Sequence, residues 1–575
     1  MVQFEEDNPD DLLGNMVILG ISLIVIAAVV IGVIAGKDRT HDDDHKMTLV
    51  AVCDQTDYKD ACKASLKAAG DSAEVKTYFR FAVNGSITEM AHAMKKVKVD
   101  KNMAPAVEDC MELIGLCMEE LQSVITILNT TAPNSSFYND SSGDIRSSLS
   151  AVLSYRRACL EGLRETTTRS TSSDIMDQLL HNPTQLTSIA LAIIYEYSQN
   201  DDVKADPPAA AAIPPPPASS NDDEFTPNPS TAGRKLLQSG GQMKPNAVVA
   251  KDRSGQYSNI TAALNAYPNG HKGRYLIYVK SGVYEENVII AKNTTQIFMY
   301  GDGLDKTIIS GIDHHFHGRG SRATTTYRRA TLSVIGDGFI CKDIGIKIPD
   351  KSRGNSMDMA AVKIQSDRAA FFNCRINGSA TSNIYALANR QLFVDCEIYG
   401  VTNIIRGDAA VVIQRSRIIL APPSPPILEN IIALQGRSDR RESTGFVIHG
   451  CTIERDQSYR YSPNYGVAEK GVAYLGMAVE KYSRTIVMES SLGDLIHPDG
   501  WYSNNNNSAL IDTVTFGECE NSGPGAGTKN RVNWKGYSVI SNSSDVMRYT
   551  AGRFIQPQNW LNGTQLHFLP GLFFR

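Results

Sequence analysis

The residue types that could carry out chemistry gather in the stretch 402–412. Within it, Asn403 is an amide, Arg406 a cation and Asp408 a carboxylate. A carboxylate can attack a carbonyl carbon, but an amide cannot, because its oxygen carries no full negative charge and its nitrogen lone pair is delocalised. Asn403 therefore cannot act as a nucleophile. That role would have to fall to Asp408, or to a carboxylate outside this stretch such as Asp358.

Short β-rich segments repeat on both sides of this stretch. In each copy an apolar residue is followed three positions later by Cys or Ser, and two positions after that by Ile or Leu. Copies of this kind with intervening turns predict stacked coils that bury their apolar faces on one another. A right-handed parallel β-helix fits best, and an antiparallel sandwich is the alternative. The copies are 371–376, 393–398, 413–418, 448–453 and 487–492.

The segment 47–203 has helical patterning instead, which predicts a small all-α helical bundle. The clearest run follows Pro105, with apolar residues at Leu113, Ile114, Cys117 and Leu121. Because Cys117 occupies an apolar helical position, we expect a buried free thiol there. Two disulfides are plausible in an oxidising compartment, one between Cys53 and Cys62 and one between Cys110 and Cys159.

Composition separates the chain into four regions. Residues 204–241 are rich in Pro, Ala, Ser and Asp and cannot bury a core, so they predict a linker. The predicted organisation is an N-terminal tail with an apolar span over 1–46, the helical bundle over 47–203, the linker, and the β-helix over 242–575. Residues 239–575 carry a net charge of +9, and the rest of the chain carries −14. A basic C-terminal half suits a polyanionic partner.

An apolar run over 16–35 is long enough to cross a bilayer. An acidic stretch precedes it, whereas a cleavable signal peptide normally begins with basic residues, so a signal anchor is favoured. Basic residues follow the span, which by charge alone would leave the chain in the cytosol. The cysteines and the Asn-x-Ser/Thr sequons favour the secretory route instead. The sequons begin at Asn84, Asn129, Asn134, Asn139, Asn259, Asn293, Asn377, Asn506, Asn542 and Asn562.

Several longer motifs resemble the pectin methylesterase family, and the resemblance runs from 245 to 572. The motifs are YVKSGVYEEN at 278–287, MYGDG at 299–303, GDGFI at 336–340, QSDR at 365–368 and YSRT at 482–485. The resemblance implies removal of methyl esters from homogalacturonan with neither a metal nor an organic cofactor. In that family one aspartate attacks the ester, a second acts as general acid and base, two glutamines stabilise the oxyanion, and an arginine and a tryptophan complete the site.

Counting from preserved anchors places other residue types at every one of these positions. The nucleophile position is Asn403, and Arg406 replaces an aromatic residue just beyond it. The general acid is replaced by Ser382, whose hydroxyl is too weak an acid to protonate a leaving methoxide. The oxyanion glutamines fall on Thr381 and Asp358, where an anionic group would repel the developing charge. The arginine and tryptophan positions are Met477 and Val479, and Thr326 resembles a retained substrate contact.

The helical region resembles the pectin methylesterase inhibitor family in its four cysteines, over 49–199. The resemblance implies an all-α four-helix bundle, in which the first pair closes an N-terminal helical hairpin and the second joins two bundle helices. At the end of the linker, Arg234, Lys235, Leu236 and Leu237 resemble the site at which a protease releases the esterase domain.

Two β-helix cysteines resemble members of family disulfides, but their usual partners are missing. The partner of Cys374 falls near Gly345 and the partner of Cys451 falls on Ser416. Cys341 or Cys396 could therefore substitute as the partner of Cys374.

Three functions follow. The first is a secreted or membrane-delivered family member that is catalytically impaired and binds pectin or a protein partner. The second is a working pectinesterase that uses Asp358 or Asp408. The third is an inhibitor of other pectinesterases through the helical region. A processing protease is an expected partner, and nucleic acid is not.

Overall fold

The computed structural model describes residues 46–97, 105–130, 141–166, 171–198, 244–312, 326–349, 359–378, 383–421, 429–457, 472–503 and 508–573. The chain divides into two compact units. The first comprises Met1–Ala104 with Arg169–Ile193, and the second comprises Pro105–Thr168 with Ile194–Arg575. The predicted span at 16–35 and the predicted processing site at 234–237 lie outside the described residues. Among the described helices, none is long and apolar enough to cross a membrane.

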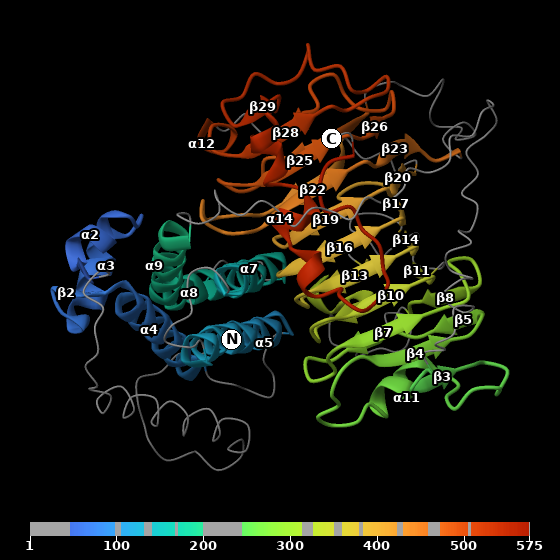
Figure 1. Ribbon diagram of the computed structural model, residues 1–575, viewed down its shortest axis with the longest axis horizontal. Coiled ribbons are helices and arrows are strands. Elements are labelled where there is room, and N and C mark those ends of the chain that lie inside the picture. The colour runs from blue at the N-terminus through green and yellow to red at the C-terminus, as the bar shows by residue number, and fades with distance from the viewer. Residues whose placement is uncertain are drawn as a thin grey trace. The chain divides into compact units, whose positions relative to one another are not determined.

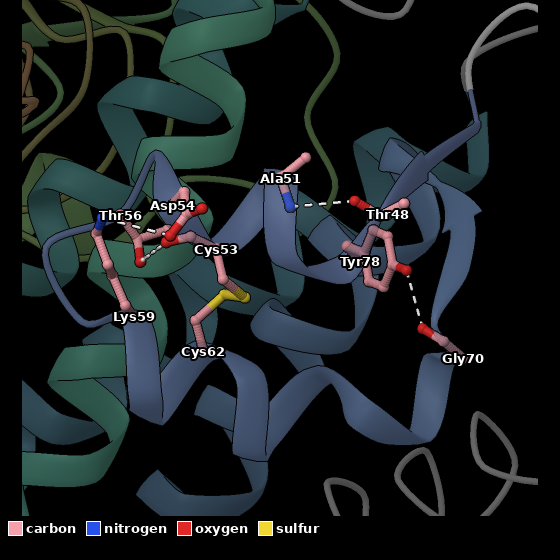
Figure 2. The surroundings of a disulfide bond; sticks show 9 residues. All are labelled: Thr48, Ala51, Cys53, Asp54, Thr56, Lys59, Cys62, Gly70 and Tyr78. Carbon is pink, nitrogen blue, oxygen red and sulfur yellow. Dashed lines mark hydrogen bonds and ion pairs between the residues drawn. A yellow bond between two sulfur atoms is a disulfide. The ribbon is translucent and has the colours of Figure 1, made fainter.

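The first unit is mainly helical. Its elements are β1 (Lys46–Thr48), α2 (Leu49–Asp54), α3 (Lys59–Leu66), η1 (Lys67–Ala69), β2 (Ser72–Glu74), α4 (Val75–Lys96), α8 (Thr171–Leu179) and the larger part of α9 (His181–Ser198). Helix α2 begins at Thr48, whose side chain accepts a hydrogen bond from the backbone N–H of Ala51 at 3.3 Å. Figure 2 shows the disulfide Cys53–Cys62 fastening α2 to α3, which confirms the first predicted bridge.

The second unit begins with two long helices, α5 (Pro105–Thr130) and α7 (Ser142–Thr166). Pro105 stands at the first position of α5, where its missing N–H costs nothing. The disulfide Cys110–Cys159 joins the two helices and confirms the second predicted bridge. Cys117 is a buried free thiol, as predicted, and burial raises its pKa well above the usual range.

The rest of the second unit is a parallel β-helix built from three sheets (Figure 1). Every neighbouring pair of strands in the three sheets is parallel, which confirms the predicted parallel stacking and excludes the antiparallel sandwich. Sheet 1 contains β3 (Ala247–Val249), β4 (Tyr275–Val279), β7 (Ile297–Tyr300), β10 (Ile340–Lys342), β13 (Ala369–Phe372), β16 (Arg390–Val394), β19 (Ala410–Gln414), β22 (Gly445–His449), β25 (Arg484–Met488), β28 (Thr515–Cys519) and β29 (Tyr537–Val539).

Sheets 2 and 3 have eight strands each. Sheet 2 contains β5 (Gly282–Glu285), β8 (Thr307–Ser310), β11 (Gly345–Lys347), β14 (Arg375–Asn377), β17 (Glu397–Gly400), β20 (Arg417–Leu420), β23 (Thr452–Arg455) and β26 (Ser491–Leu492). Sheet 3 contains β6 (Val288–Ile290), β9 (Ala330–Val334), β12 (Ala360–Ile364), β15 (Ile384–Ala386), β18 (Ile405–Gly407), β21 (Asn430–Gln435), β24 (Ala473–Met477) and β27 (Trp501–Tyr502). Short helices complete the unit: α11 (Ile260–Asn265), η3 (Thr326–Arg328), α12 (Ser508–Ile511), α13 (Ser543–Met547), α14 (Ala551–Phe554) and η7 (Pro557–Asn559).

The predicted repeat is the period of the coils. Each copy runs from a strand of sheet 1, through a turn that holds the Cys or Ser, into a strand of sheet 2. The last residues of the five copies stand side by side in register and are buried: Ile376, Ile398, Ile418, Ile453 and Leu492. The rings of Phe371 and Phe393 stack at 4.9 Å in the same core. Apolar side chains from successive coils therefore form continuous ladders, which is how a coil too small to have its own core is stabilised.

The predicted disulfide of Cys374 is wrong, because Cys374, Cys341 and Cys396 are all free and buried. The Sγ atoms of Cys374 and Cys341 lie 3.7 Å apart. In the turn after its strand, the Cys374 thiol lies 3.4 Å from the carbonyl of Phe372, and Cys396 lies 3.4 Å from that of Val394. The turns thus direct these thiols to backbone carbonyls of the core, where they pack as small apolar side chains.

Candidate functional site

Sheet 3 carries the residues that the sequence singles out, and a row of side chains runs along its outer face. Lys363 on β12 pairs in register with Tyr385 on β15, which pairs with Arg406 on β18. Their chain neighbours Val362, Ile364, Ile384, Ala386 and Ile405 belong to the hydrophobic core. Since side chains alternate between the two faces of a strand, Lys363, Tyr385 and Arg406 face outward. We call these three residues the basic row.

Asn403, at the predicted nucleophile position, is half-buried and stands two residues before β18. Its backbone has φ 47°, in the left-handed region that asparagine tolerates better than most residues. The next two residues, Ile404 and Ile405, are fully buried, and Ile405 begins the strand. The fold therefore holds the amide at the strand-start edge of sheet 3, beside the basic row.

The structure describes some of the remaining predicted positions and not others. Met477 ends β24 and pairs with Tyr502 on β27, so it lies on sheet 3, and Val479 is half-buried two residues further on. Thr326 begins η3, directly before Tyr327. Asp358, Thr381 and Ser382 lie outside the described residues. In the sequence, Asp358 and Ser382 stand two positions before β12 and β15, as Asn403 stands two positions before β18.

Arg406 is stacked on its neighbour in the basic row. Its guanidinium carbon lies 4.4 Å from the centre of the Tyr385 ring, within the range of a cation–π contact. The Nε atom of Arg406 is buried and has no hydrogen-bond partner among the described residues. Burial raises the pKa of Tyr385 to about 12, and the Arg406 charge opposes that rise.

Lys363 lies at the other end of the basic row, in a buried environment. Its Nζ donates a 2.7 Å hydrogen bond to the carbonyl of Tyr327 and lies 3.7 Å from the centre of that residue's ring. Burial lowers the pKa of Lys363 to about 8. The Tyr327 hydroxyl accepts a 3.0 Å hydrogen bond from the side chain of Gln365. Sequence reasoning did not identify Lys363 or Tyr385 as site residues, although both lie within stretches compared with the family.

Asp408, the alternative nucleophile, stands at the opposite end of β18 from Asn403. The strand β18 lies between the two positions, and five residues of fully extended chain would span at most roughly 16 Å. The Asp408 carboxylate is buried and accepts hydrogen bonds from Thr444 at 2.7 Å, Gln435 at 2.9 Å and Ser154 of α7 at 3.1 Å. A carboxylate held by three donors and far from Asn403 is poorly placed to replace a nucleophile at that position.

A second buried carboxyl group, Glu442, lies next to Asp408. One of its oxygens accepts hydrogen bonds from the backbone N–H groups of Ser438 and Asp439, at 3.0 and 2.6 Å. Burial raises the pKa of Glu442 well above its usual range, and the charge of Asp408 raises it further. Burial also raises the pKa of Asp408. The pair therefore holds a proton that two exposed carboxyl groups would release. Sequence analysis missed Glu442, since its proximity to Asp408 comes from folding.

We expect this carboxyl pair to make stability fall as pH rises. A folded pKa above the unfolded value contributes stability that is present below the ordinary carboxyl pKa of about 4.3 and is lost as pH climbs through the raised value. Replacing Glu442→Gln should reduce the fall in unfolding free energy as pH rises above the ordinary carboxyl pKa, by up to about 1.4 kcal/mol per pH unit. Urea denaturation at several pH values measures this slope.

The matched control for the carboxyl pair is Asp395→Asn, an acid-to-amide change in the exposed pair that Asp395 forms with Arg415. It should leave the slope as in the natural chain. Equal slopes for the natural chain and Glu442→Gln would contradict the shared proton.

Helix α7 contacts the β-helix within the second unit at several points. Asp144 forms ion pairs with Arg368 and Arg390, both at 2.7 Å. Ser154 also donates a 2.8 Å hydrogen bond to the carbonyl of Asp408. The guanidinium of Arg157 lies where a β-carbon on Gly436 would be, so a larger residue at 436 would displace this side chain.

The parallel β-helix and the sequence motifs that it carries, such as those at 278–287 and 336–340, indicate a protein of the pectinesterase class. Residues 246–558 match the family described as pectinesterase, and residues 48–193 match the plant invertase/pectin methylesterase inhibitor family. The chain is similar to Probable pectinesterase/pectinesterase inhibitor 21 of Arabidopsis thaliana, with 32% identity over 97% of this chain and 82% of the relative. It is also similar to Pectinesterase 1 of Citrus sinensis, with 32% identity over 94% of this chain and 92% of the relative.

Among solved structures, the pectin methylesterase from carrot is similar to the β-helix. It has a TM-score of 0.52 and 35% identity, over 58% of this chain and all of the carrot chain. The chain belongs to the pectinesterase/pectinesterase inhibitor family.

Proposed function

We propose that this chain binds cell-wall pectin and does not catalyse its demethylesterification by the family mechanism. The observation that carries the proposal is the state of the nucleophile position. The fold presents Asn403 at the strand-start edge of sheet 3, where the resemblance places the attacking aspartate. Met477 and Val479, in place of the arginine and tryptophan, remove two further family groups on the same sheet.

Chemistry supports the same proposal. A neutral amide cannot form the covalent intermediate, and serine at the general acid position cannot protonate methoxide usefully. Relocation of the nucleophile to Asp408 is disfavoured by its three hydrogen bonds and by its distance along β18. The basic surface charge of residues 239–575 suits a polyuronate ligand. Delivery through the secretory pathway to the cell wall, with a retained N-terminal anchor, is part of this proposal.

The test is a paired measurement on the full chain. Retention on immobilised homogalacturonan is expected, and methanol release from highly methyl-esterified homogalacturonan is expected to stay at the buffer rate. Retention without methanol supports the proposal. Release of methanol in proportion to protein concentration would overturn the loss of catalysis, and absence of retention would overturn the binding.

The match of residues 48–193 to the inhibitor family favours a second candidate function, inhibition of other pectinesterases. Added to an active pectinesterase, the full chain would then slow methanol release, and cleavage at 234–237 followed by dissociation of the helical region would strengthen the effect. Unchanged methanol release after both cleavage and dissociation would exclude this candidate.

A further inference from the structure

We propose that the surface around Arg406 binds the free carboxylate of a uronic acid residue, so that this chain prefers de-esterified over methyl-esterified homogalacturonan. The inference rests on the proposed function, because it specifies which form of the polysaccharide this face of sheet 3 holds. It concerns the residues in which this chain differs from its family, and it does not use the esterase reaction.

The first support is the change of charge at the strand-start edge of sheet 3. An ionised nucleophile beside the ligand would repel a second carboxylate within a few ångströms. Asn403 removes that charge and supplies an amide N–H₂ that can donate a hydrogen bond to a carboxylate. Three residues further on, Arg406 adds a positive charge where the family has an aromatic residue. Both changes favour an anionic ligand over a neutral ester.

The second support is the state of the Arg406 side chain. Arg406 has no ion pair with any described residue, and its buried Nε has no hydrogen-bond partner there. A buried N–H donor without a partner is unfavourable, and a bound acceptor near the guanidinium would reduce that cost. The Tyr385 ring contacts the guanidinium at 4.4 Å and holds it in place beside sheet 3. A guanidinium group can bind a carboxylate through two parallel hydrogen bonds from its N–H groups.

The third support is the position of Lys363. It stands two strands from Arg406 on the same face, so the two backbones are separated by about 10 Å. Lys363 also has no ion pair with a described residue, and its ammonium group adds positive charge to the row, which the nearby carboxylates of Glu112 and Asp109 on α5 partly offset. Helix α7 contributes further charges near Tyr385, namely Arg157, Glu161 and the exposed Glu165. Arg157 and Glu161 form an ion pair at 2.7 Å and largely offset one another.

The experiment compares two ligands of equal length on the full chain. Isothermal titration calorimetry would use fully de-esterified and fully methyl-esterified oligogalacturonides at an ionic strength of about 0.15 M, where exposed charges are partly screened. We expect the natural chain to bind the de-esterified oligomer at least about tenfold more tightly, since a charge-assisted bidentate pair contributes about that factor.

Variants locate the preference. Arg406→Gln removes the charge and Arg406→Phe restores the aromatic type that the resemblance places there, and both should bind the two oligomers equally. Asn403→Asp should weaken binding of the de-esterified oligomer alone. The matched control is Arg415→Gln, which makes the same charge change at an ion pair with Asp395 away from sheet 3 and should keep the preference.

Each outcome decides between the two proposals. Equal binding of both oligomers by the natural chain overturns this inference and leaves pectin binding standing, whereas binding of neither overturns pectin binding itself. A tenfold preference that survives in both Arg406 variants overturns the assignment to Arg406. If Arg406→Gln fails to fold, as judged by its circular dichroism, Asn403→Asp still tests the charge at the site, and an unchanged preference in that variant overturns the inference.

Discussion

Restoring six family residues is expected to start methanol release from methyl-esterified homogalacturonan. The substitutions are Asp358→Gln, Thr381→Gln, Ser382→Asp, Asn403→Asp, Met477→Arg and Val479→Trp. A positioned general acid or base contributes about a hundredfold or more, and an aspartate nucleophile opens the covalent route. The restored chain should therefore release methanol more than about a hundredfold faster than the natural chain. Gas chromatography of methanol against time measures both rates.

The control for this experiment is the same variant with Asn403 retained. It has five of the six restored residues and should stay as inactive as the natural chain, because only the nucleophile is missing. A natural chain as active as the restored one would show that another carboxylate carries the reaction. A folded but inactive restored chain would show that neighbouring residues that differ from the family, such as Arg406, also prevent catalysis.

The second large effect is expected from the disulfide between α5 and α7. The double replacement Cys110→Ala, Cys159→Ala removes a bridge that closes a sequence separation of 49 residues. In the loop-entropy description, such a bridge stabilises the folded chain by about 4 kcal/mol. Urea denaturation of the oxidised natural chain and the double variant measures the loss.

The internal comparison for the disulfide is the bridge Cys53–Cys62, which spans only 9 residues. Its removal should cost about 3 kcal/mol, less than removal of the longer bridge. Cys117→Ser, which changes a buried thiol without breaking any bridge, separates loss of the covalent link from loss of packing. Equal costs for the two bridges would contradict the loop-entropy account.

The fold was predictable because its signal is repeated. Residues such as Ile376 and Ile398 recur at the same position of successive coils. A repeat of this kind predicts where each strand lies and also which strand it pairs with. The disulfides of the helical region were predictable because Cys53 and Cys62 lie close together in the sequence and Cys159 is a suitable partner for Cys110. The bonding state of Cys374 was not, since two nearby thiols bond only if the turns orient them toward each other.

Sequence comparison could assign residues to positions along the chain, but it could not predict contacts between residues far apart in the sequence. Comparison with the family assigned Asn403 to the nucleophile position, and the structure adds only that this residue stands two positions before β18. The stacking of Arg406 on Tyr385 depends on the register of two strands that the sequence does not specify. The pairing of Asp408 with Glu442 depends on a loop that returns to the same coil. Contacts across strands and loops therefore required the structure.

The contacts of α7 have a consequence for processing. Asp144 and Ser154 hold this helix to the β-helix through side chains and one backbone carbonyl. A protease that cut the chain between 234 and 237 would break one peptide bond and none of these contacts. The cut protein would remain a nicked particle that elutes as one species from a sizing column and gives two bands on a denaturing gel. Cleavage and dissociation are thus separate steps with separate rates, and a cleaved chain is not yet a released one.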